Sequence, residues 1–490
     1  MFLQLRRENS KLKKQLKVQA EQLKAQEIII NELKIQITDL TSKLAKNSNN
    51  SHKPPTSDNL SDRKQGKKNK NTKGKKSSGG QKDHKGVTLQ ISSEVDEKII
   101  HSPEACDICG ESLIKESIES TNEKFRQEVD IAIEKLIRNH HIAYKLCPKC
   151  KVKIKGQYPV GINSAVQYSN NIKVISAYLS IFQMIPSNRL TGTFEDIFSL
   201  KLSEGSIYNW NKKVASKVKE TVDVIKQNLL KGDILHVDET GCYIEDARYW
   251  AYVFSNQFFT FLDFNKGRSK KALNEIGFLS QYKGDVMSDY YSMYQTYSNY
   301  IENYFCNAHL LRDLRFIEEV EKRDWAEKMK ILLLEIKNLS ENQTLLFPFQ
   351  RYLLSKKYDI LIEDGLKEEE PYLKKIIQSK SKQGRKKQTK SKNILDRMKK
   401  QKRGILGFAY YLNIPFTNNL AERDLRFLKV KQKISNLFRS KIAAKEYFQI
   451  ASFISTMKKQ TFISTMKKQN LPVWESLYKV MMDKEIVFMN

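Results

Sequence analysis

Three acidic side chains stand in segments where carboxylates could bind divalent cations. Asp238 lies in ILHVDETGCYIE, Asp289 in DVMSDYYSMY, and Glu422 in NNLAERDLRFLK. Carboxylate oxygens bind Mg²⁺ or Mn²⁺ while leaving coordination places for water and phosphate. Two such ions activate a water or a 3′-hydroxyl and stabilise the leaving oxygen in phosphoryl transfer. An isolated Asp at a strand end is ordinarily a turn or cap residue. The prediction of a cation site therefore depends on whether the fold brings the three acids together.

The elements predicted around these acids would bring the three together. Alternating and β-rich segments predict three strands, then a helix, then a fourth strand: 232–245, 247–255, 258–264, 268–282 and 284–294. This is the opening order of a ribonuclease-H-like sheet, in which the first and fourth strands are neighbours. Asp238 and Asp289 would then emerge at one edge of the sheet, and a helix carrying Glu422 would cross that edge. Asn418 and Asn419 are candidate caps for this helix, and Arg423 and Arg426 are candidate phosphate contacts.

Four of the six cysteines form two CxxC pairs, Cys106 with Cys109 and Cys147 with Cys150. Two residues between thiolates allow both to reach one tetrahedral ion, so the four predict one structural Zn²⁺. Unrelated reduced thiols are the alternative. Between the pairs lie 37 residues, 110–146, which is longer than a compact zinc ribbon requires.

A helix, short turn and helix are predicted in TFEDIFSLKLSEGSIYNWNKKVASKV, with Ser203 as the N-cap of the second helix. Ser206, Tyr208 and Asn209 would lie in the opening turns of that helix and could face a DNA groove. A helical hairpin that only packs is the alternative.

The N-terminal region combines a heptad pattern with a cationic linker. Apolar residues repeat at Leu16, Leu23, Ile30, Ile37 and Leu44, with a second seam at Leu5, Leu12, Leu33 and Leu40. This pattern favours a parallel dimeric coiled coil over a solitary amphipathic helix. Residues 51–90 hold eleven Lys/Arg against three Asp and cannot form a core, which indicates a mobile tether for a phosphate backbone or a plain solubilising linker.

Composition points to an acidic polymer as partner. The 490 residues carry 86 Lys+Arg against 56 Asp+Glu, a net charge of +30. We expect no membrane span and no secretory signal, and six cysteines are too few for a disulfide scaffold. We therefore expect a cytoplasmic, nucleoid-associated protein.

Several motifs resemble, in the same order, those of the insertion sequence 66 family of bacterial transposases. They are HVDET, MSDYYSMY and NNLAERDLR, together with the heptad start, SNNSHKPPTSD, GGQKDHKG, the CxxC pairs and SEGSIYNW. The resemblance implies a DDE nuclease core of ribonuclease-H fold in which Asp238, Asp289 and Glu422 are the catalytic metal ligands. Cys306 and His309 in CNAH resemble the family's CxxH element, which either lines the active site or supports it; we favour support.

Two features lie outside the minimal core. Between Asp289 and Glu422 we expect a helical insertion at about 325–403, and residues 374–403 hold fourteen Lys/Arg against one Asp. That run is expected to contact DNA, with a solvated helix face as the alternative. SFISTMKKQ at 452–460 recurs as TFISTMKKQ at 461–469, and the copy must either loop out or extend a helix.

The expected fold is multidomain α+β, with these parts: coiled coil 1–45, basic linker 46–90, zinc module 91–157, helix-turn-helix region 158–228, and ribonuclease-H-like core 229–490. The expected function is a transposase that cuts element ends and joins them to target DNA, using two Mg²⁺ or Mn²⁺. Expected partners are the inverted-repeat ends, target DNA, a second copy through the coiled coil, and accessory transposition proteins. A DNA-binding repressor or inactive remnant with a dead core is the alternative, and a junction-resolving nuclease is a third, which would cut without terminal repeats.

Overall fold

The computed structural model describes residues 2–47, 50–51, 89, 91–118, 125–131, 133–159, 161–297, 302–342, 346–378, 388–467, 473–484 and 486. Most of the linker expected at 46–90 lies outside these residues. Within them, no helix has both the length and the apolar character needed to cross a bilayer.

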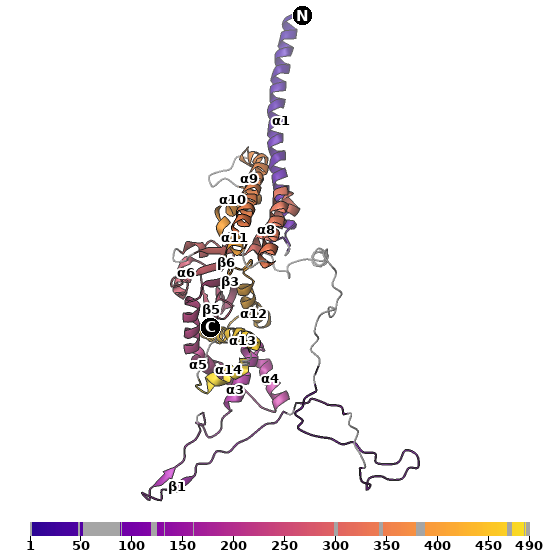
Figure 1. The fold of residues 1–490 in the computed structure, drawn as a ribbon. Helices are drawn as coiled ribbons and strands as arrows, with labels where there is room; N and C mark the ends of the chain where they lie inside the picture. The colour runs from indigo at the N-terminus through magenta and orange to yellow at the C-terminus, as the bar shows by residue number, and fades with distance from the viewer. Residues whose placement is uncertain are drawn as a thin grey trace.

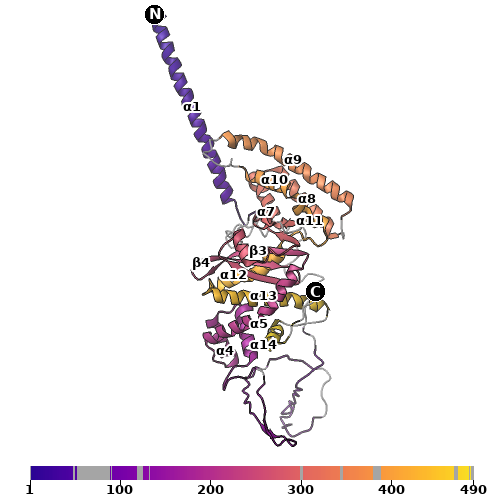
Figure 2. The same cartoon turned by 90° about the vertical axis from the view of Figure 1, so that its left-hand side faces the viewer.

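A five-stranded mixed sheet lies at the centre of the molecule (Figures 1 and 2). Its order is β5-β4-β3-β6-β7. The strands are β3 (Ile234–Ile244), β4 (Ala247–Ser255), β5 (Thr260–Asn265), β6 (Asp285–Ser288) and β7 (Asn303–Phe305). The first three run antiparallel, whereas β6 pairs with β3 and β7 with β6 in parallel. The first and fourth strands of the predicted order are therefore neighbours, as the sequence pattern indicates.

Helices cover most of the sheet. α12 (Asn419–Ser435) packs on β3 and β4, and α13 (Lys441–Lys467) packs on β5 and on the long helix α5 (Glu204–Leu230). The shared core includes Val218 and Ile225 of α5, Leu425 of α12 and Phe448 of α13. Near the turn of the β3–β4 hairpin, Tyr243 is 53% exposed.

The predicted helix at 268–282 is shorter than expected. α6 spans Lys270–Ile276 and ends at Gly277, whose φ of +73° is the left-handed conformation that closes a helix. Ser269 caps its start by accepting a hydrogen bond from the Ala272 N–H.

A helical subdomain follows β7 and has its own core, with Trp325, Leu333, Tyr358 and Leu395 fully or almost fully buried. Its helices are α7 (Asn307–Phe316), the π-helical turn η4 (Ile317–Glu321), α8 (Asp324–Asn342), α9 (Pro348–Gln378), α10 (Lys390–Lys400) and α11 (Lys402–Tyr410). Figure 2 shows α9 running across the outside of α8 and α10.

The basic run in this subdomain is less available than its composition suggests. Of the seven Lys and Arg at 388–403, five form ion pairs with carboxylates: Lys390 and Arg397 with Asp313, Lys392 with Asp396, Lys402 with Asp359, and Arg403 with Glu302. Lys399 and Lys400 remain exposed. Positions 379–387 lie outside the described residues, so the expected DNA contact there stays a prediction.

On the opposite side of the sheet, short helices form a third, smaller core. α3 (Asn170–Ala177), the π-helical turn η2 (Tyr178–Phe182), α4 (Ser187–Phe198) and the start of α5 enclose Leu190, Phe194 and Ile207. α14 (Val473–Met481) packs against α3 and α5.

At the N-terminus, α1 (Phe2–Leu44) projects from the molecule as a single rod (Figure 1). Its apolar seam is exposed; Leu16, Leu23 and Ile37 are 62%, 65% and 61% accessible. The turn after α1 is fixed to the helical subdomain, because the Asn50 side chain donates to Glu319 Oε2 at 3.3 Å and is itself 2% exposed.

Candidate active site

Asp238 and Asp289 come from neighbouring parallel strands. Asp289 directly follows the last residue of β6, as predicted. Asp238, by contrast, lies in the middle of β3 rather than at its end, because the β3–β4 hairpin continues the antiparallel ladder as far as Ile244. Only the parallel pairing with β6 stops before Asp238, at His236 opposite Met287.

The three predicted acids are electrostatically coupled. The pKa of Asp238 is raised well above its usual range, first by burial and then by the negative charges of Glu239, Asp289 and Glu422. Several carboxylates thus share a poorly solvated region. One oxygen of Asp238 accepts the Glu239 N–H at 2.8 Å, and one of Asp289 accepts the Tyr291 N–H at 2.9 Å.

Glu422 lies in the first turn of α12. Its Oε1 is buried, and among the described residues it has no hydrogen-bond partner. His309 Nε2 lies 3.8 Å from Glu422 Oε1. Such a buried, unsatisfied oxygen costs free energy unless a ligand compensates it.

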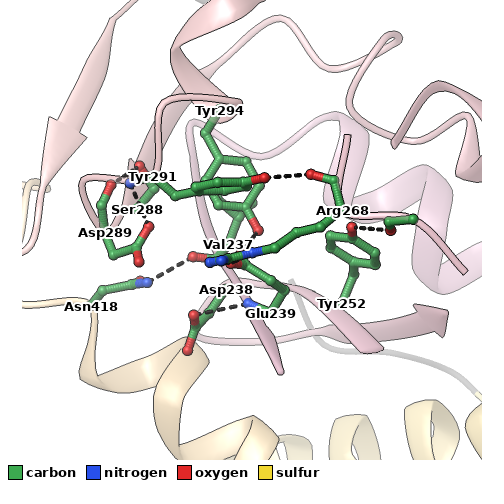
Figure 3. A network of polar contacts seen from close by, with 11 residues as sticks. Val237, Asp238, Glu239, Tyr252, Arg268, Ser288, Asp289, Tyr291, Tyr294 and Asn418 are labelled. Carbon is green, nitrogen blue, oxygen red and sulfur yellow. Dashed lines mark hydrogen bonds and ion pairs between the residues drawn. The ribbon is translucent and has the colours of Figure 1, made fainter. Parts of the chain in front are cut away.

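Asn418 joins the helix of Glu422 to the strand of Asp238. We expected it to cap α12, and it does occupy the N-cap position, but its side chain makes no cap bond. Instead, its Nδ2 donates to the Val237 carbonyl at 2.8 Å (Figure 3). Its Oδ1 lies 2.9 Å from His236 Nδ1. Burial lowers the pKa of His236 to about 4, so the neutral ring donates from Nδ1. The exposed Asn419 makes no cap bond either among the described residues.

Cys306 and His309 lie beside this junction. The Asn418 N–H donates to Cys306 Sγ at 3.1 Å, and burial raises the pKa of the Cys306 thiol to about 11. Donor atoms of Cys306, His309 and Glu422 lie within 4.8 Å of one another, close enough to share a metal ion. A neutral thiol engaged as an acceptor fits structural support better than metal ligation.

A second network, which the sequence analysis missed, lies on the other face of β3. Glu239 accepts hydrogen bonds from Arg268 Nε at 2.8 Å and from the Tyr294 hydroxyl (Figure 3). Burial and the Asp289 charge raise the pKa of Glu239, whereas Tyr294 and Arg268 oppose that shift. The sequence shows that Glu239 is next to Asp238. It does not show that Glu239 pairs with Arg268, because the two are 29 residues apart.

Cations flank the acids along α12. Arg423 and Arg426, both predicted, are exposed and form no ion pair among the described residues. Lys429 was missed, although it lies seven residues after Glu422 and hence on the same helix face. Burial lowers the pKa of Lys429, and the Asp238 charge opposes that shift, which places the ammonium near the acids.

The candidate recognition helix agrees in part with expectation. Ser203 caps α5 by accepting the Ser206 N–H at 3.1 Å. The Ser206 hydroxyl lies 2.9 Å from Ser203 Oγ, so it belongs to the cap rather than to an outward face. Tyr208 is 42% exposed and Asn209 is exposed, and both remain available to a partner.

The four cysteines form two separate knuckles. Cys106 accepts the Gly110 N–H and Cys147 accepts the Lys151 N–H through their carbonyls, and β1 (Tyr144–Leu146) and β2 (Lys153–Lys155) flank the second turn. Hydrogen bonds from Cys109 and Cys150 lower the pKa of the Cys106 and Cys147 thiols, respectively. In the described part of the chain, no cluster of three metal-ligating side chains includes these cysteines. A single zinc joining both pairs therefore stays a prediction.

Comparison with known families settles the family of this fold and site. The sequence profile described as "Transposase IS66 family" matches residues 166–446, more than half of the chain. The chain belongs to the IS66 transposase family. A second profile, "Family of unknown function (DUF6444)", matches residues 4–90. No protein with a curated description matches the chain. The IS66 match includes Asp238, Asp289, Glu422, Cys306 and His309.

The donor set fits hard divalent ions. Asp238, Asp289 and Glu422 offer oxygen ligands from three elements, and burial followed by the charges of neighbouring carboxylates raises the pKa of Asp238. The unsatisfied Glu422 Oε1 is the sort of atom that a bound cation would satisfy.

Proposed function

We propose that the chain is a DDE transposase that cleaves DNA at the ends of its insertion sequence and joins the freed 3′-hydroxyl to target DNA. The observation that carries the proposal is that Asp238, Asp289 and Glu422 interact electrostatically and come from two neighbouring strands, β3 and β6, and from α12, which packs on β3. The strand order β5-β4-β3-β6-β7 supports a ribonuclease-H-like core.

In this proposal the three acids hold two Mg²⁺ or Mn²⁺ ions. Ions bound there supply electrostatic stabilisation of the attacking and leaving oxygens of the phosphodiester. Asn418 fixes the strand of Asp238 against the helix of Glu422. Arg423, Arg426 and Lys429 lie along α12 to bind the DNA backbone beside the acids.

The remaining parts would recognise and pair the DNA ends. Tyr208 and Asn209 would contact inverted-repeat DNA, and one Zn²⁺ would join Cys106 and Cys109 to Cys147 and Cys150. The exposed seam of α1 would form a homodimer or higher oligomer. We propose a bacterial cytoplasmic setting, on the nucleoid, with accessory transposition proteins as further partners.

The test is a nicking assay on duplexes made from the DNA that flanks the gene, with Mg²⁺. We expect Asp238→Asn to reduce nicking by about 10³-fold while DNA binding persists, because it removes a principal electrostatic group at the reacting centre. Asp246→Asn is the matched control, since Asp246 is exposed in the turn of the same hairpin. If the unaltered protein binds these duplexes but never nicks them with Mg²⁺ or Mn²⁺, the enzymatic proposal fails and the repressor or inactive remnant replaces it.

A further inference from the structure

Arg268 is held in one orientation from several sides. Its guanidinium lies over two aromatic rings, that of Trp250 at 4.6 Å and that of Tyr291 at 3.9 Å. The backbone is fixed too, because the Tyr252 hydroxyl donates to the Gly267 carbonyl at 2.9 Å and the Tyr291 hydroxyl donates to the Arg268 carbonyl (Figure 3). A long, flexible side chain is thereby pre-organised before any ligand arrives.

The ion pair of Arg268 with Glu239 leaves part of the guanidinium unused. Its Nε and Nη2 donate to Glu239 Oε1. A guanidinium has five N–H donors, and among the described residues Nη1 has no acceptor. The Glu239 side chain is 1% exposed, whereas that of Arg268 is 37% exposed. The arginine therefore presents a donor edge to solvent.

The Arg268 side chain lies near one of the proposed metal ligands, Asp289. Tyr291, which stacks on Arg268, donates its N–H to Asp289 at 2.9 Å. Glu239, which binds Arg268, donates its N–H to Asp238 at 2.8 Å. Arg268 also interacts electrostatically with Asp289 itself. Tyr291 thus links the guanidinium to Asp289, whereas Asp238 lies on the face of β3 opposite Glu239.

We propose that Arg268 is a further catalytic residue, which donates to a non-bridging oxygen of the scissile phosphate or the next phosphate along the strand. This inference rests on the proposed function. Arginine suits the role, because its planar donor edge matches phosphate oxygens and it stays protonated beside a developing negative charge. The competing explanation is that Arg268 only neutralises Glu239, but that task requires neither an exposed donor edge nor two aromatic walls.

A charge-balanced double variant separates the two explanations. Arg268→Gln alone leaves Glu239 buried without its partner, so a loss of nicking would be ambiguous. Glu239→Gln/Arg268→Gln removes both charges, and such replacements tend to leave stability little changed. We expect the double variant to melt within a few degrees of the unaltered protein and yet to nick about 10² to 10³ times more slowly.

Two further measurements complete the design. Glu239→Gln alone keeps the guanidinium and its aromatic walls, so we expect it to retain nicking within about tenfold. Arg248→Gln is the matched control and should nick normally, since Arg248 stacks on the same Trp250, at 4.8 Å, but is not joined to the acids. Losing one phosphate contact should also reduce the slope of log affinity against log salt by about 1 in the double variant.

Restored nicking in the double variant, with an unchanged salt slope, would overturn the assignment and leave Arg268 as a neutralising residue. If the unaltered protein does not nick at all, the proposed function fails. The salt slope, measured by DNA binding alone, still decides whether Arg268 contacts phosphate, because an unchanged slope excludes that contact.

Discussion

At the scale of single residues, Asn418 joins three parts of the site through two side-chain hydrogen bonds and one backbone hydrogen bond. Its side-chain amide binds His236 and Val237, the two residues immediately before Asp238. Its backbone N–H binds the sulfur of Cys306, which directly follows β7. Four residues later the same helix carries Glu422. Asn418 is 1% exposed, so water cannot replace these bonds. We therefore regard it as a positioning residue for the two acids.

Replacing Asn418 tests this role. In Asn418→Ala the Val237 carbonyl and the His236 N–H lose their partner, which should lower the free energy of unfolding by about 1–3 kcal/mol. A displacement of Glu422 of about 1 Å would slow nicking by about 10²-fold. The decisive measurement is a Mg²⁺ titration of nicking, in which the half-saturating concentration should rise because the ligands no longer converge.

Asn419→Ala is the control for this experiment, since Asn419 is the adjacent, exposed asparagine and should change neither the melting temperature nor the titration. A variant at Asn418 that is less stable, but whose Mg²⁺ titration matches that of the unaltered protein, would show a structural role only.

At the scale of elements, the nine-residue duplication lengthens a helix. α13 is helical through both copies as far as Lys467, so the second copy does not loop out in the described part. The first copy makes the buried contacts: Lys459 Nζ donates to Asp424 at 2.6 Å, and Ser452 accepts the Leu262 N–H at 3.0 Å. Nine residues turn a helix by about 900°, which is half a turn beyond two full turns. In an unbroken helix, equivalent positions nine residues apart therefore lie on opposite faces.

Equivalent substitutions in the two copies should accordingly differ in effect. Phe453 is 0% exposed. Phe453→Ala should lower the free energy of unfolding by about 3–5 kcal/mol, because the change leaves a cavity in the main core. Phe462→Ala, at the equivalent position of the second copy, should cost less than about 1 kcal/mol. Denaturant unfolding of both variants measures the difference. Equal losses would mean that both copies contribute to the core.

Local patterns were sufficient for the strands but not for side-chain partners. Alternation predicted the strands, because apolar periodicity is written in consecutive residues, and the order of three strands, a helix and a strand predicted that the first and fourth are neighbours. The early end of α6 was also readable, at Gly277. The pairing of Arg268 with Glu239 was not, and neither was the neutralisation of Arg397 by Asp313, 84 residues away. Such partners depend on tertiary packing, which periodicity does not encode.

At the scale of the whole molecule, local sequence patterns predict each half of the zinc module but not how the two halves meet. Each CxxC turn forms from local backbone hydrogen bonds, such as Gly110 N–H to Cys106 O at 2.9 Å. Bringing the two turns together would require free energy that apolar packing at the first turn does not supply, because Ile108 there is exposed. Metal binding to four thiolates provides folding free energy of that kind.

The rod formed by α1 is attached at its base to the helical subdomain. Lys46 lies over the Phe316 ring at 5.7 Å, and Asn50 binds Glu319, so the base of the rod is attached to the helical subdomain beside the sheet. The seam along the rod has no partner within the described chain, and an exposed heptad seam of this length favours a second helix. Because the rod is fixed at its base, pairing of two rods would also fix the distance and orientation between the two active sites.

Two charges in the seam should therefore separate the copies. Ile30→Asp/Ile37→Asp places carboxylates at two core positions of the coiled coil, whose burial without partners is strongly unfavourable, and we expect a monomer by light scattering at micromolar concentration. Asn31→Asp/Thr38→Asp adds the same charges one position later, outside the seam, and should leave the dimer intact. Nicking of single ends should survive in the monomer, since each chain keeps its own acids, whereas products that join two ends should disappear. An unaltered protein that is already monomeric, or a seam variant that keeps its partner, would contradict assembly through α1.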